Sequence, residues 1–491
     1  MLPTIATGNV SSSLGGGYEV ANSCRFNDGD SAYMHKTPGS AGNRRTFTFS
    51  CWIKRGVLGI QTFFSSYNAD DATRPDGIRF SADDRLYVNF RNTEDAIVST
   101  ARLFRDVSAW YHICVAVDTT QGVAANRVKI YINGGSVETS LTGDGAVDSA
   151  SYMAQNFECG GFNRDSKHQI GSRAIGTPTL YFDGYMAEVC FIDGSALTPT
   201  SFGEFDEDSP TIWKPKDVSG LTFGTNGFYL DFEDSANLGN DANGGTDLTE
   251  VNLAATDQAT DTPTNNFATL NPLGMPSTNT TFSEGNLTVN VASGSSFFSI
   301  PTIGVSSGKW YVEGKLVTGT VDGGLTYSDY GFADRSDSAG QSLYSSSARV
   351  FWLSAWDSKI NYRTGGSTTA GLQTGKTGLS QGDFFQLYLD MDNELMYWGR
   401  NGSVTNSTGI SFNGKESLTG EYFFAFGDQF TSGTYKYSTN FGQGSIDGAA
   451  VTAYSDANGY GSFKYNPTVT TDEGSKDFLA LCTKNLGAYG G

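Results

Sequence analysis

The sequence predicts an all-β protein in which an ordered linker joins two antiparallel β-sandwich domains of the jelly-roll type. Glycine is abundant at 61 of 491 residues, aromatic residues reach 13% and charged residues only 17%, as in proteins with many short strands and tight turns. Stretches of Ala, Leu, Glu and Lys with a 3.6-residue period are nearly absent, which disfavours helical layers. Strand-like alternation also stops near residue 233 and resumes after residue 272, and the chain is long for a single core.

The N-terminal arm, residues 1–20, consists mostly of small and polar residues with one glycine cluster. Such a segment does not bury enough apolar surface to fold alone. We expect it to be either disordered or ordered by docking onto a neighbour, and the sequence does not choose between the two.

The first domain, residues 21–235, alternates strands and turns at close, regular spacing. We expect two short strands at residues 24–27 and 32–35, separated by a turn. Further strands are expected at residues 46–54, 61–67, 77–81, 85–91, 110–118, 127–132, 166–173, 181–193 and 227–232. In the strand at residues 46–54, Phe47, Phe49, Cys51 and Ile53 fall on one face, so this face should point to the core. Asn133-Gly134 predicts a tight hairpin turn after the strand at residues 127–132.

Four motifs of this half resemble laminin-G-like, concanavalin-A-like jelly-roll domains. They are Phe47-Thr-Phe-Ser-Cys-Trp-Ile-Lys, Trp110-Tyr-His-Ile-Cys-Val-Ala-Val-Asp, Arg127-Val-Lys-Ile-Tyr-Ile-Asn-Gly and Phe182-Asp-Gly-Tyr-Met-Ala-Glu-Val-Cys-Phe-Ile-Asp-Gly-Ser-Ala-Leu-Thr-Pro. The resemblance covers roughly residues 20 to 235. It implies the jelly-roll fold and says little about the ligand, because this architecture hosts glycan binders, protein binders, hydrolases and structural modules.

The linker, residues 236–279, is rich in Asn, Asp, Thr, Ala and Gly, a composition typical of turns and linkers. Apolar residues nevertheless recur along it: Leu248, Val251, Leu253, Phe267 and Leu270. A flexible tether would carry no such anchors. We therefore expect an ordered strap that lies on the two domains.

The second domain, residues 280–491, resumes the alternation, with strands expected near residues 286–292, 308–317, 329–333, 350–353, 384–390, 394–398, 422–426 and 435–441. Residues 390–395 read as a tight turn between antiparallel strands. Gly304-Val-Ser-Ser-Gly-Lys-Trp-Tyr-Val-Glu, Leu387-Tyr-Leu-Asp-Met-Asp-Asn-Glu-Leu-Met-Tyr-Trp and Asn440-Phe-Gly-Gln resemble SPRY-type β-sandwiches, although Glu394 stands where these usually have a turn glycine.

Net charge and cysteine content indicate which partners and which cellular compartment suit the chain. A formal net charge of −20 disfavours nucleic acid and anionic membranes as partners, and no apolar run reaches the roughly 20 residues of a membrane span. The N-terminal residues lack the basic and apolar regions of a signal peptide, so we do not expect export by a cleaved signal. Six cysteines are too few for a disulfide scaffold; buried free thiols are favoured, with a Cys24–Cys51 or Cys159–Cys190 bridge left open.

The succession of a laminin-G-like jelly roll, this linker and a SPRY-like sandwich resembles structural proteins of tailed bacteriophages. The resemblance implies a virion protein made in the bacterial host cytoplasm. The implied partners are other virion proteins and a glycan of the host surface, and the implied assembly is a homo-oligomer, with a trimer as one option.

The sequence offers no convincing catalytic or metal site. Asp231 and Glu233 place two acids on one strand face, but a solvated strand end explains them better than a polysaccharide hydrolase does. No cofactor is expected. Calcium is the one candidate ion, with oxygen ligands at Asp28 and Asp30 and at Asp390 and Asp392, although turn capping is the stronger explanation for all four.

For ligand binding, the best aromatic cluster is Trp352, Trp356, Tyr362 and Arg363. Aromatic faces beside a cation suit saccharides, but Trp352 and Trp356 differ by an even number and fit two core positions on one strand equally well.

Three functions remain. The first is a non-enzymatic virion protein, a tail fibre or spike component that attaches to host-surface glycans. The alternative is a capsid or tail decoration protein with a mainly stabilising role. The third is a polysaccharide depolymerase that depends on Asp231 or Glu233.

Overall fold

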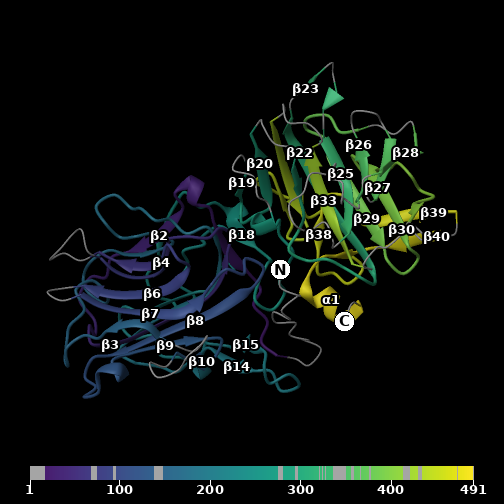
Figure 1. Ribbon diagram of the computed structural model, residues 1–491. Coiled ribbons are helices and arrows are strands. Elements are labelled where there is room, and N and C mark those ends of the chain that lie inside the picture. Colours follow the sequence, from purple (N-terminus) through teal and green to yellow (C-terminus); the bar gives the residue numbers. More distant parts are fainter. Residues whose placement is uncertain are drawn as a thin grey trace. The chain divides into compact units, whose positions relative to one another are not determined.

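The computed structural model describes residues 17–67, 75–91, 95–137, 147–274, 280–292, 297–319, 321–322, 325–326, 328–334, 350–354, 359–364, 367–374, 378–412, 421–428, 434–472 and 474–489. The chain folds into two compact units, and the boundary between them lies between Thr264 and Asn265. Both are built almost wholly of antiparallel strands, which confirms the predicted fold class (Figure 1).

The strands of the first unit are β1 (Ser23–Phe26), β2 (Tyr33–Lys36), β3 (Thr46–Arg55), β4 (Gln61–Ser66), β5 (Asp76–Phe80), β6 (Arg85–Arg91), β7 (Asp95–Leu103), β8 (Trp110–Asp118), β9 (Val128–Ile132), β10 (Gly135–Ser136), β11 (Val147–Ser151), β12 (His168–Ile170), β13 (Gly184–Asp193), β14 (Gly203–Phe205), β15 (Trp213–Pro215), β16 (Phe228–Leu230), β17 (Thr249–Val251) and β18 (Gln258–Ala259). Seven of these strands were not predicted from the sequence: β7, β10, β11, β14, β15, β17 and β18.

Two sheets form the sandwich of the first unit. Sheet A has the strand order β10-β9-β8-β3-β13-β1-β18, with β16 beside β13, and sheet B has the order β11-β7-β6-β5-β4-β12-β2-β17. Their inner faces enclose one large apolar cluster. The predicted inward face of β3 is confirmed, because Phe47, Phe49, Cys51 and Ile53 all belong to this cluster. The expected turn is present too: Asn133 and Gly134 both have positive φ, as a two-residue hairpin between antiparallel strands requires.

Two β-bulges change which residues face the core. In β4 the register shifts between Thr62 and Phe64, so Phe63 and Phe64 are both buried in the core. In β13 the register shifts between Ala187 and Cys190 around Glu188, whose φ is +50°. Because of this bulge, the residues of β13 that face the core change from even to odd positions, and Glu188 lies outside the core cluster.

The outer face of sheet A is covered. Trp52, Trp110, Trp213 and Tyr185 form one buried apolar cluster there, and the β14–β15 hairpin contributes Trp213 to it. The buried His112 is held in this layer: its Nε2 lies 2.9 Å from Ser50 Oγ, and its Nδ1 accepts a hydrogen bond from Trp213 Nε1 at 3.0 Å. Burial lowers the pKa of His112 to about 3, so this histidine is a neutral structural residue.

Part of the linker belongs to the first unit. Its β17 pairs with β2 and its β18 pairs with β1, so each sheet gains an edge strand. Leu248 is buried in the core. Asp261 is fully buried beside Lys54, with Oδ2 at 2.7 Å from Nζ, and it accepts a hydrogen bond from Trp110 Nε1 at 3.0 Å. This segment is an ordered strap, held by strand pairing, apolar burial and a buried ion pair.

The second unit contains β19 (Thr280–Ser283), β20 (Thr288–Val291), β21 (Phe297–Ser299), β22 (Lys309–Gly319), β23 (Val321–Asp322), β24 (Leu325–Thr326), β25 (Ser328–Asp334), β26 (Val350–Ser354), β27 (Lys359–Thr364), β28 (Ser367–Gln373), β29 (Phe384–Asp390), β30 (Leu395–Arg400), β31 (Ser403–Val404), β32 (Ile410–Ser411), β33 (Tyr422–Asp428), β34 (Tyr435–Asn440), β35 (Ser445–Ile446), β36 (Ala449–Ala450), β37 (Tyr454–Ser455), β38 (Ser462–Phe463), β39 (Thr468–Thr471), β40 (Gly474–Asp477), β41 (Leu479–Ala480) and the helix α1 (Thr483–Tyr489).

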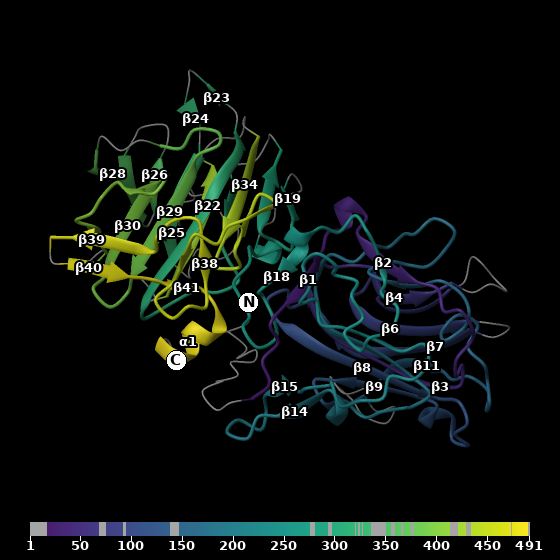
Figure 2. The ribbon, with the colours of Figure 1, turned by 180° about the vertical axis from the view of Figure 1, so that it is seen from behind.

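This unit is a second sandwich. One sheet runs β19-β20-β34-β22-β29-β30-β31 and the other β21-β33-β25-β26-β27-β28 (Figure 2). Phe267 and Leu270, the last two predicted anchors of the linker, are fully buried in this unit. β29 and β30 pair antiparallel across the predicted turn, which is confirmed, and Glu394 there has a φ of +55°.

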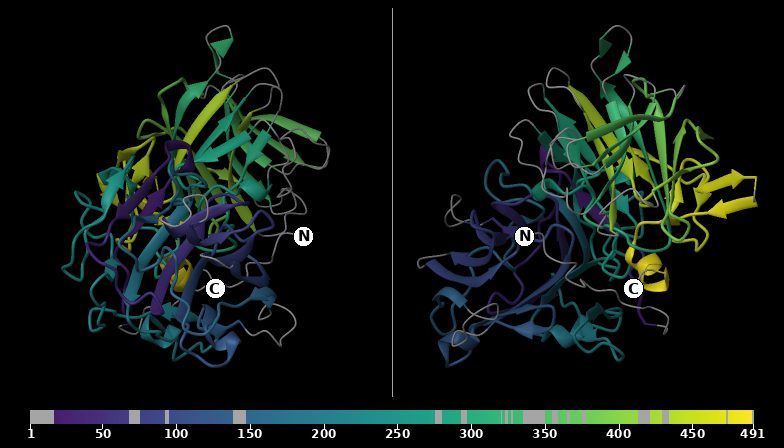
Figure 3. Two further views of the ribbon diagram at one scale, coloured as in Figure 1. Left: turned by 90° about the vertical axis from the view of Figure 1, so that its left-hand side faces the viewer. Right: turned by 45° about the vertical axis from the view of Figure 1, so that its right-hand side comes forward.

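Buried Glu313, in the middle of β22, links this strand to neighbouring segments of the second unit. Its Oε1 accepts from Asn440 Nδ2 and from the Lys464 amide, and its Oε2 accepts from the Tyr311 hydroxyl and the Tyr465 amide. α1 follows at the C-terminal end (Figure 3). Among the described residues there is no helix with the length and apolar character needed to cross a membrane. All six cysteines are buried and unpaired.

Candidate functional site

The outer face of sheet B, opposite the core, carries a polar row at the middle of β4, β5 and β6. Thr62, Arg79 and Tyr87 lie side by side across these three strands, because Thr62 pairs with Arg79 and Arg79 with Tyr87. Ile78, Phe80, Leu86 and Val88, the strand neighbours of these residues, point the other way into the core.

A second row runs next to the first, and its centre is a glycine. Ser65 pairs with Gly77, and Gly77 pairs with Asn89. A Cβ atom added to Gly77 would meet nothing closer than Asn89 Oδ1 at 3.4 Å. The missing side chain therefore leaves a hollow between the side chains of Ser65 and Asn89.

A cavity of about 160 Å³ opens at this hollow. Thr62, Asp76, Gly77, Arg79, Asn89 and Arg173 contribute its polar lining, and Ile60, Pro75 and Leu180 contribute apolar atoms. Thr62 is only 1% exposed, and its hydroxyl has no hydrogen-bond partner among the described residues. Since leaving a buried hydroxyl unpaired costs about 1–3 kcal/mol, a partner that enters the cavity would recover this free energy.

The neighbouring side chains are held in place. The Arg79 guanidinium lies over the Tyr87 ring, 4.2 Å from its centroid. Asn89 Nδ2 donates to the Pro75 carbonyl at 2.9 Å, and Asp76 Oδ2 accepts from the amides of Gly161 and Phe162 at 2.8 and 2.9 Å. The polar lining is therefore ordered before any ligand binds, which reduces the entropic cost of binding.

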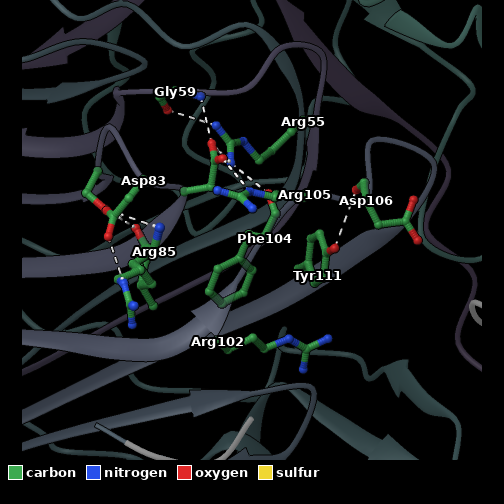
Figure 4. A network of polar contacts seen from close by, with 12 residues as sticks. Arg55, Gly59, Asp83, Arg85, Arg102, Phe104, Arg105, Asp106 and Tyr111 are labelled. Atoms are coloured by element: carbon green, nitrogen blue, oxygen red, sulfur yellow. Dashed lines mark hydrogen bonds and ion pairs between the residues drawn. The ribbon is translucent and has the colours of Figure 1, made fainter. Parts of the chain in front are cut away.

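A network of arginines and acids fixes the turn that enters β4 (Figure 4). Arg55 Nη2 donates to the Gly59 carbonyl at 2.8 Å, and the Gly59 amide donates to Asp84 Oδ1 at 2.7 Å. Arg55 and Arg105 both form ion pairs with Asp84, at 3.1 and 2.9 Å. Ile60, at the edge of the cavity, follows directly after this fixed turn.

Asp84 stays ionised in this network. Burial opposes ionisation, but the hydrogen bond from Gly59 and the two guanidinium groups outweigh it and lower the pKa of Asp84. Phe80 also stacks under Arg55, whose guanidinium lies 4.2 Å from the ring centroid. These contacts assign the network a structural role in shaping the cavity edge.

The aromatic residues singled out in the second domain lie elsewhere. Trp352 is 2% exposed and Tyr362 is 6% exposed, and both belong to buried apolar clusters of the second unit. Arg363 is half-buried on β27 opposite Val350, and Trp356 lies outside the described residues. Trp352 thus occupies a core position, as its place on the strand allowed, and so does Tyr362. Whether this cluster contacts a ligand stays a prediction.

The four calcium candidates make local contacts. Asp28 and Asp30 are exposed, and Asp30 accepts a hydrogen bond from Asn27 Nδ2 at 2.9 Å. Asp390 accepts from Asn393 and lies 3.5 Å from Lys476 Nζ, and Asp392 accepts from the Gly308 amide. Within the described ranges, no three His, Cys, Asp or Glu side chains gather in a way that could hold a metal ion. Calcium binding remains an untested expectation.

Asp231 and Glu233 have a third acidic neighbour that the sequence did not reveal. Burial, together with the nearby charges of Asp231 and Glu233, raises the pKa of Glu188 to about 7. The hydroxyls of Tyr229 and Tyr18 donate to Glu188 Oε2, at 2.8 and 3.2 Å. Glu188 is thus a buried carboxylate under two tyrosines, on the outer side of sheet A.

Sequence reasoning missed the cavity, although one signal for it was present. Residues 76–80 read Asp-Gly-Ile-Arg-Phe, and a glycine inside a strand marks a bulge or a place where something approaches the backbone closely. Finding Thr62 required the bulge in β4, and finding Arg173 required the fold.

Comparisons with known proteins agree with the lectin-like sandwich. Residues 27–201 match the concanavalin A-like lectin/glucanases superfamily, and a search of curated proteins finds no match. This superfamily includes both lectins and glucanases, so the match supports the lectin-like fold and does not assign an activity.

Solved structures give weak similarities. The chain is similar to the SPRY domain of human HERC1, with 17% identity over 33% of this chain and 91% of that chain and a TM-score of 0.27. It is similar to domains LG4-5 of the mouse laminin alpha1 chain, with 11% identity over 86% of this chain and 89% of that chain and a TM-score of 0.30. It is also similar to a heptameric pentraxin of Limulus polyphemus, with 15% identity, 34% and 71% coverage and a TM-score of 0.24.

Proposed function

We propose that the protein is a non-enzymatic glycan-binding protein and that its ligand enters the cavity on the outer face of sheet B. The observation that carries the proposal is the buried, unpartnered hydroxyl of Thr62 beside the hollow at Gly77. Saccharides offer hydroxyl groups that both donate and accept hydrogen bonds, so they match Thr62 and the Asn89 amide. The flat guanidinium of Arg79 also lines the cavity, and it lies over the ring of Tyr87.

The size of the cavity limits the ligand. At about 160 Å³ it is smaller than the roughly 300–1,000 Å³ of pockets for drug-sized ligands. It therefore suits one sugar unit, such as the end or a branch of a longer glycan, and the rest of the chain would lie on the sheet. Such a site binds weakly alone, and several copies in an oligomer would raise the avidity.

For the biological setting we propose a tail fibre or spike of a tailed bacteriophage, assembled as a homo-oligomer with other virion proteins. This part rests on the resemblance of the sequence. A capsid or tail decoration protein is the alternative. Labelling of intact particles decides between them: tail labelling supports attachment, and labelling over the capsid shell contradicts it.

The glycan proposal is tested with the full chain on a glycan array. Gly77→Val adds a side chain that fills the hollow, and we expect it to abolish binding, because the first added atom has room and the branched methyl groups occupy the cavity. Lys167→Gln changes an exposed charge outside the cavity and serves as a control. Binding that survives Gly77→Val, or a chain that binds no saccharide, contradicts the proposal.

A polysaccharide depolymerase is the second candidate, and the carboxylate of Glu188 favours it. A carboxylic acid with a pKa of about 7 is suited to general acid catalysis, and Asp231 and Glu233 are its acidic neighbours. Against it, Glu188 is 5% exposed and covered by two tyrosine hydroxyls. Release of reducing ends from host polysaccharide, lost in Asp231→Ala or Glu233→Ala variants that keep their fold, would establish this activity.

A further inference from the structure

We propose that the cavity on sheet B takes the acetamido group of an N-acetylated sugar, whose N–H donates to Asn89 Oδ1 and whose carbonyl accepts from the Thr62 hydroxyl. This inference rests on the proposed glycan-binding function and names the class of sugar. Asn89 and Thr62 both line the cavity, and both are buried. Because an acetamido group is uncharged, its recognition does not depend on the charged side chains of the lining.

The amide of Asn89 presents its oxygen to the cavity. Its Nδ2 donates to the Pro75 carbonyl at 2.9 Å, and because a carbonyl only accepts, the nitrogen of the amide has to lie on that side. Oδ1 is then turned to the hollow, 3.4 Å from the point where a Cβ atom of Gly77 would stand. Within the part of the chain that the structure describes, no donor bonds to this oxygen. A ligand that fills the hollow therefore has to bring a donor to it.

Thr62 supplies the second polar group. Its hydroxyl has no hydrogen-bond partner among the described residues, and a hydroxyl donates as readily as it accepts, so it suits a carbonyl of the ligand. The backbone of Thr62 is held in place, because its amide donates to the Leu180 carbonyl at 2.9 Å. The cavity thus offers one fixed acceptor and one fixed hydroxyl.

The spacing of these two groups favours an amide over a single sugar hydroxyl. Thr62 pairs with Arg79, two residues along β5 from Gly77, so Thr62 and Gly77 are diagonal neighbours, and such neighbours lie roughly 7–8 Å apart. Asn89 Oδ1 lies next to Gly77. A hydroxyl oxygen with two hydrogen bonds of about 2.8 Å joins groups at most about 5.6 Å apart. An amide adds the separation of its nitrogen and its oxygen and spans roughly 8 Å, so it reaches both groups at once.

The methyl of the acetamido group has an apolar place in the same cavity. Ile60, Pro75 and Leu180 contribute apolar atoms to the lining. Ile60 is 39% exposed, so a methyl placed against it removes apolar surface from water, which is worth about 4-fold in affinity. The volume of about 160 Å³ has room for the acetamido group and for part of the sugar ring.

The experiment measures the affinity of the full chain for matched sugars by titration calorimetry. The methyl glycosides of N-acetylglucosamine and N-acetylgalactosamine are compared with those of glucose and galactose, and with 2-O-acetyl analogues that keep the carbonyl and the methyl but lack the N–H. One hydrogen bond is worth about 5-fold. Two of them and the methyl predict that an N-acetylated sugar binds about 100-fold more tightly than its parent, and about 5-fold more tightly than its 2-O-acetyl analogue.

A variant at Thr62 tests the carbonyl contact. Thr62→Val keeps the shape of the side chain and removes a hydroxyl that has no partner among the described residues, so the fold should persist. We expect it to weaken binding of the N-acetylated sugars by about 5-fold and to leave the parent sugars unchanged. Thr211→Val, the same change at an exposed position outside the cavity, should alter none of these affinities.

The outcomes separate this inference from the proposed function. Parent sugars that bind as tightly as the N-acetylated ones, with binding lost in Gly77→Val, overturn the acetamido assignment and leave the glycan-binding function standing. A preference for N-acetylated sugars that Thr62→Val does not reduce, or 2-O-acetyl analogues that bind equally well, also overturns it, because the acetamido group then makes other contacts. If no saccharide binds, both proposals are wrong.

Discussion

Replacing Glu188 with Gln should stabilise the first unit in a pH-dependent way. Glu188 stands at the bulge of β13 and is 5% exposed, and its Oε2 accepts hydrogen bonds from Tyr18 and Tyr229. Gln has the same shape and keeps one oxygen to accept these bonds. The change therefore removes the charge and leaves the packing in place.

The magnitude follows from the pKa of Glu188, which burial raises from 4.5 to about 7. A group whose pKa is higher in the folded state contributes most stability at low pH, and that contribution is lost as the pH rises. For Glu188 the loss begins near pH 4.5 and is complete above about pH 7. At about 1.4 kcal/mol per pKa unit, it amounts to about 3 kcal/mol. The neutral Gln avoids this loss, so Glu188→Gln should be nearly neutral at pH 4 and stabilise by about 3 kcal/mol at pH 8.

Urea unfolding followed by brief thiol labelling measures this effect in the first unit alone. Five buried cysteines, Cys24, Cys51, Cys114, Cys159 and Cys190, belong to that unit, and Cys482 belongs to the other. Glu207→Gln, at an exposed position, is the control and should change nothing at either pH. A stability difference for Glu188→Gln that is the same at pH 4 and pH 8, or a loss of stability at pH 8, would refute the reasoning.

Three further predictions use the same labelling assay. Asp261→Asn should destabilise the first unit by about 3–5 kcal/mol, because it leaves the buried Lys54 ammonium without its counter-ion. A double variant that also replaces Lys54 with Met should recover stability if this cause is right. An unchanged stability of the single variant would contradict the prediction. Glu313→Gln should destabilise the second unit by about 1–3 kcal/mol, since an NH₂ group replaces an oxygen that accepts two hydrogen bonds. Thiol labelling of Cys482 measures this change. An unchanged stability would show that these hydrogen bonds contribute nothing. Glu394→Gly should stabilise the second unit by up to about 1 kcal/mol, because glycine adopts the positive φ of this turn without strain, and a clear loss of stability would contradict it.

The strands that alternate cleanly were predicted well. In β3 the apolar side chains at 47, 49, 51 and 53 recur every second residue, and the structure buries this face in the core. The β29–β30 turn was also predicted, because residues 390–395 join two strongly apolar strands. β7 and β11 were missed because Asp95–Leu103 and Val147–Ser151 contain many small and polar residues, and cross-strand partners hold them in the sheet.

The bulges explain the other differences. Along β13 the sequence places Met186, Glu188 and Cys190 in one phase, yet Met186, Val189 and Phe191 face the core because the backbone inserts one residue at Glu188. Local alternation does not indicate such an insertion. The same limit applies to β4, where the bulge places Phe63 and Phe64 both in the core and fixes the face on which Thr62 lies.

The all-strand class, the faces of the regular strands, the apolar anchors of the linker and the burial of the cysteines could be predicted, because each depends on residue type and short-range spacing. Which polar residues meet depends on the three-dimensional fold. Thr62, Gly77, Asn89 and Arg173 are separated by up to about a hundred positions along the chain, and strand pairing brings them around one cavity. The charge state of Glu188 was decided in the same way, because it depends on the groups that bury it.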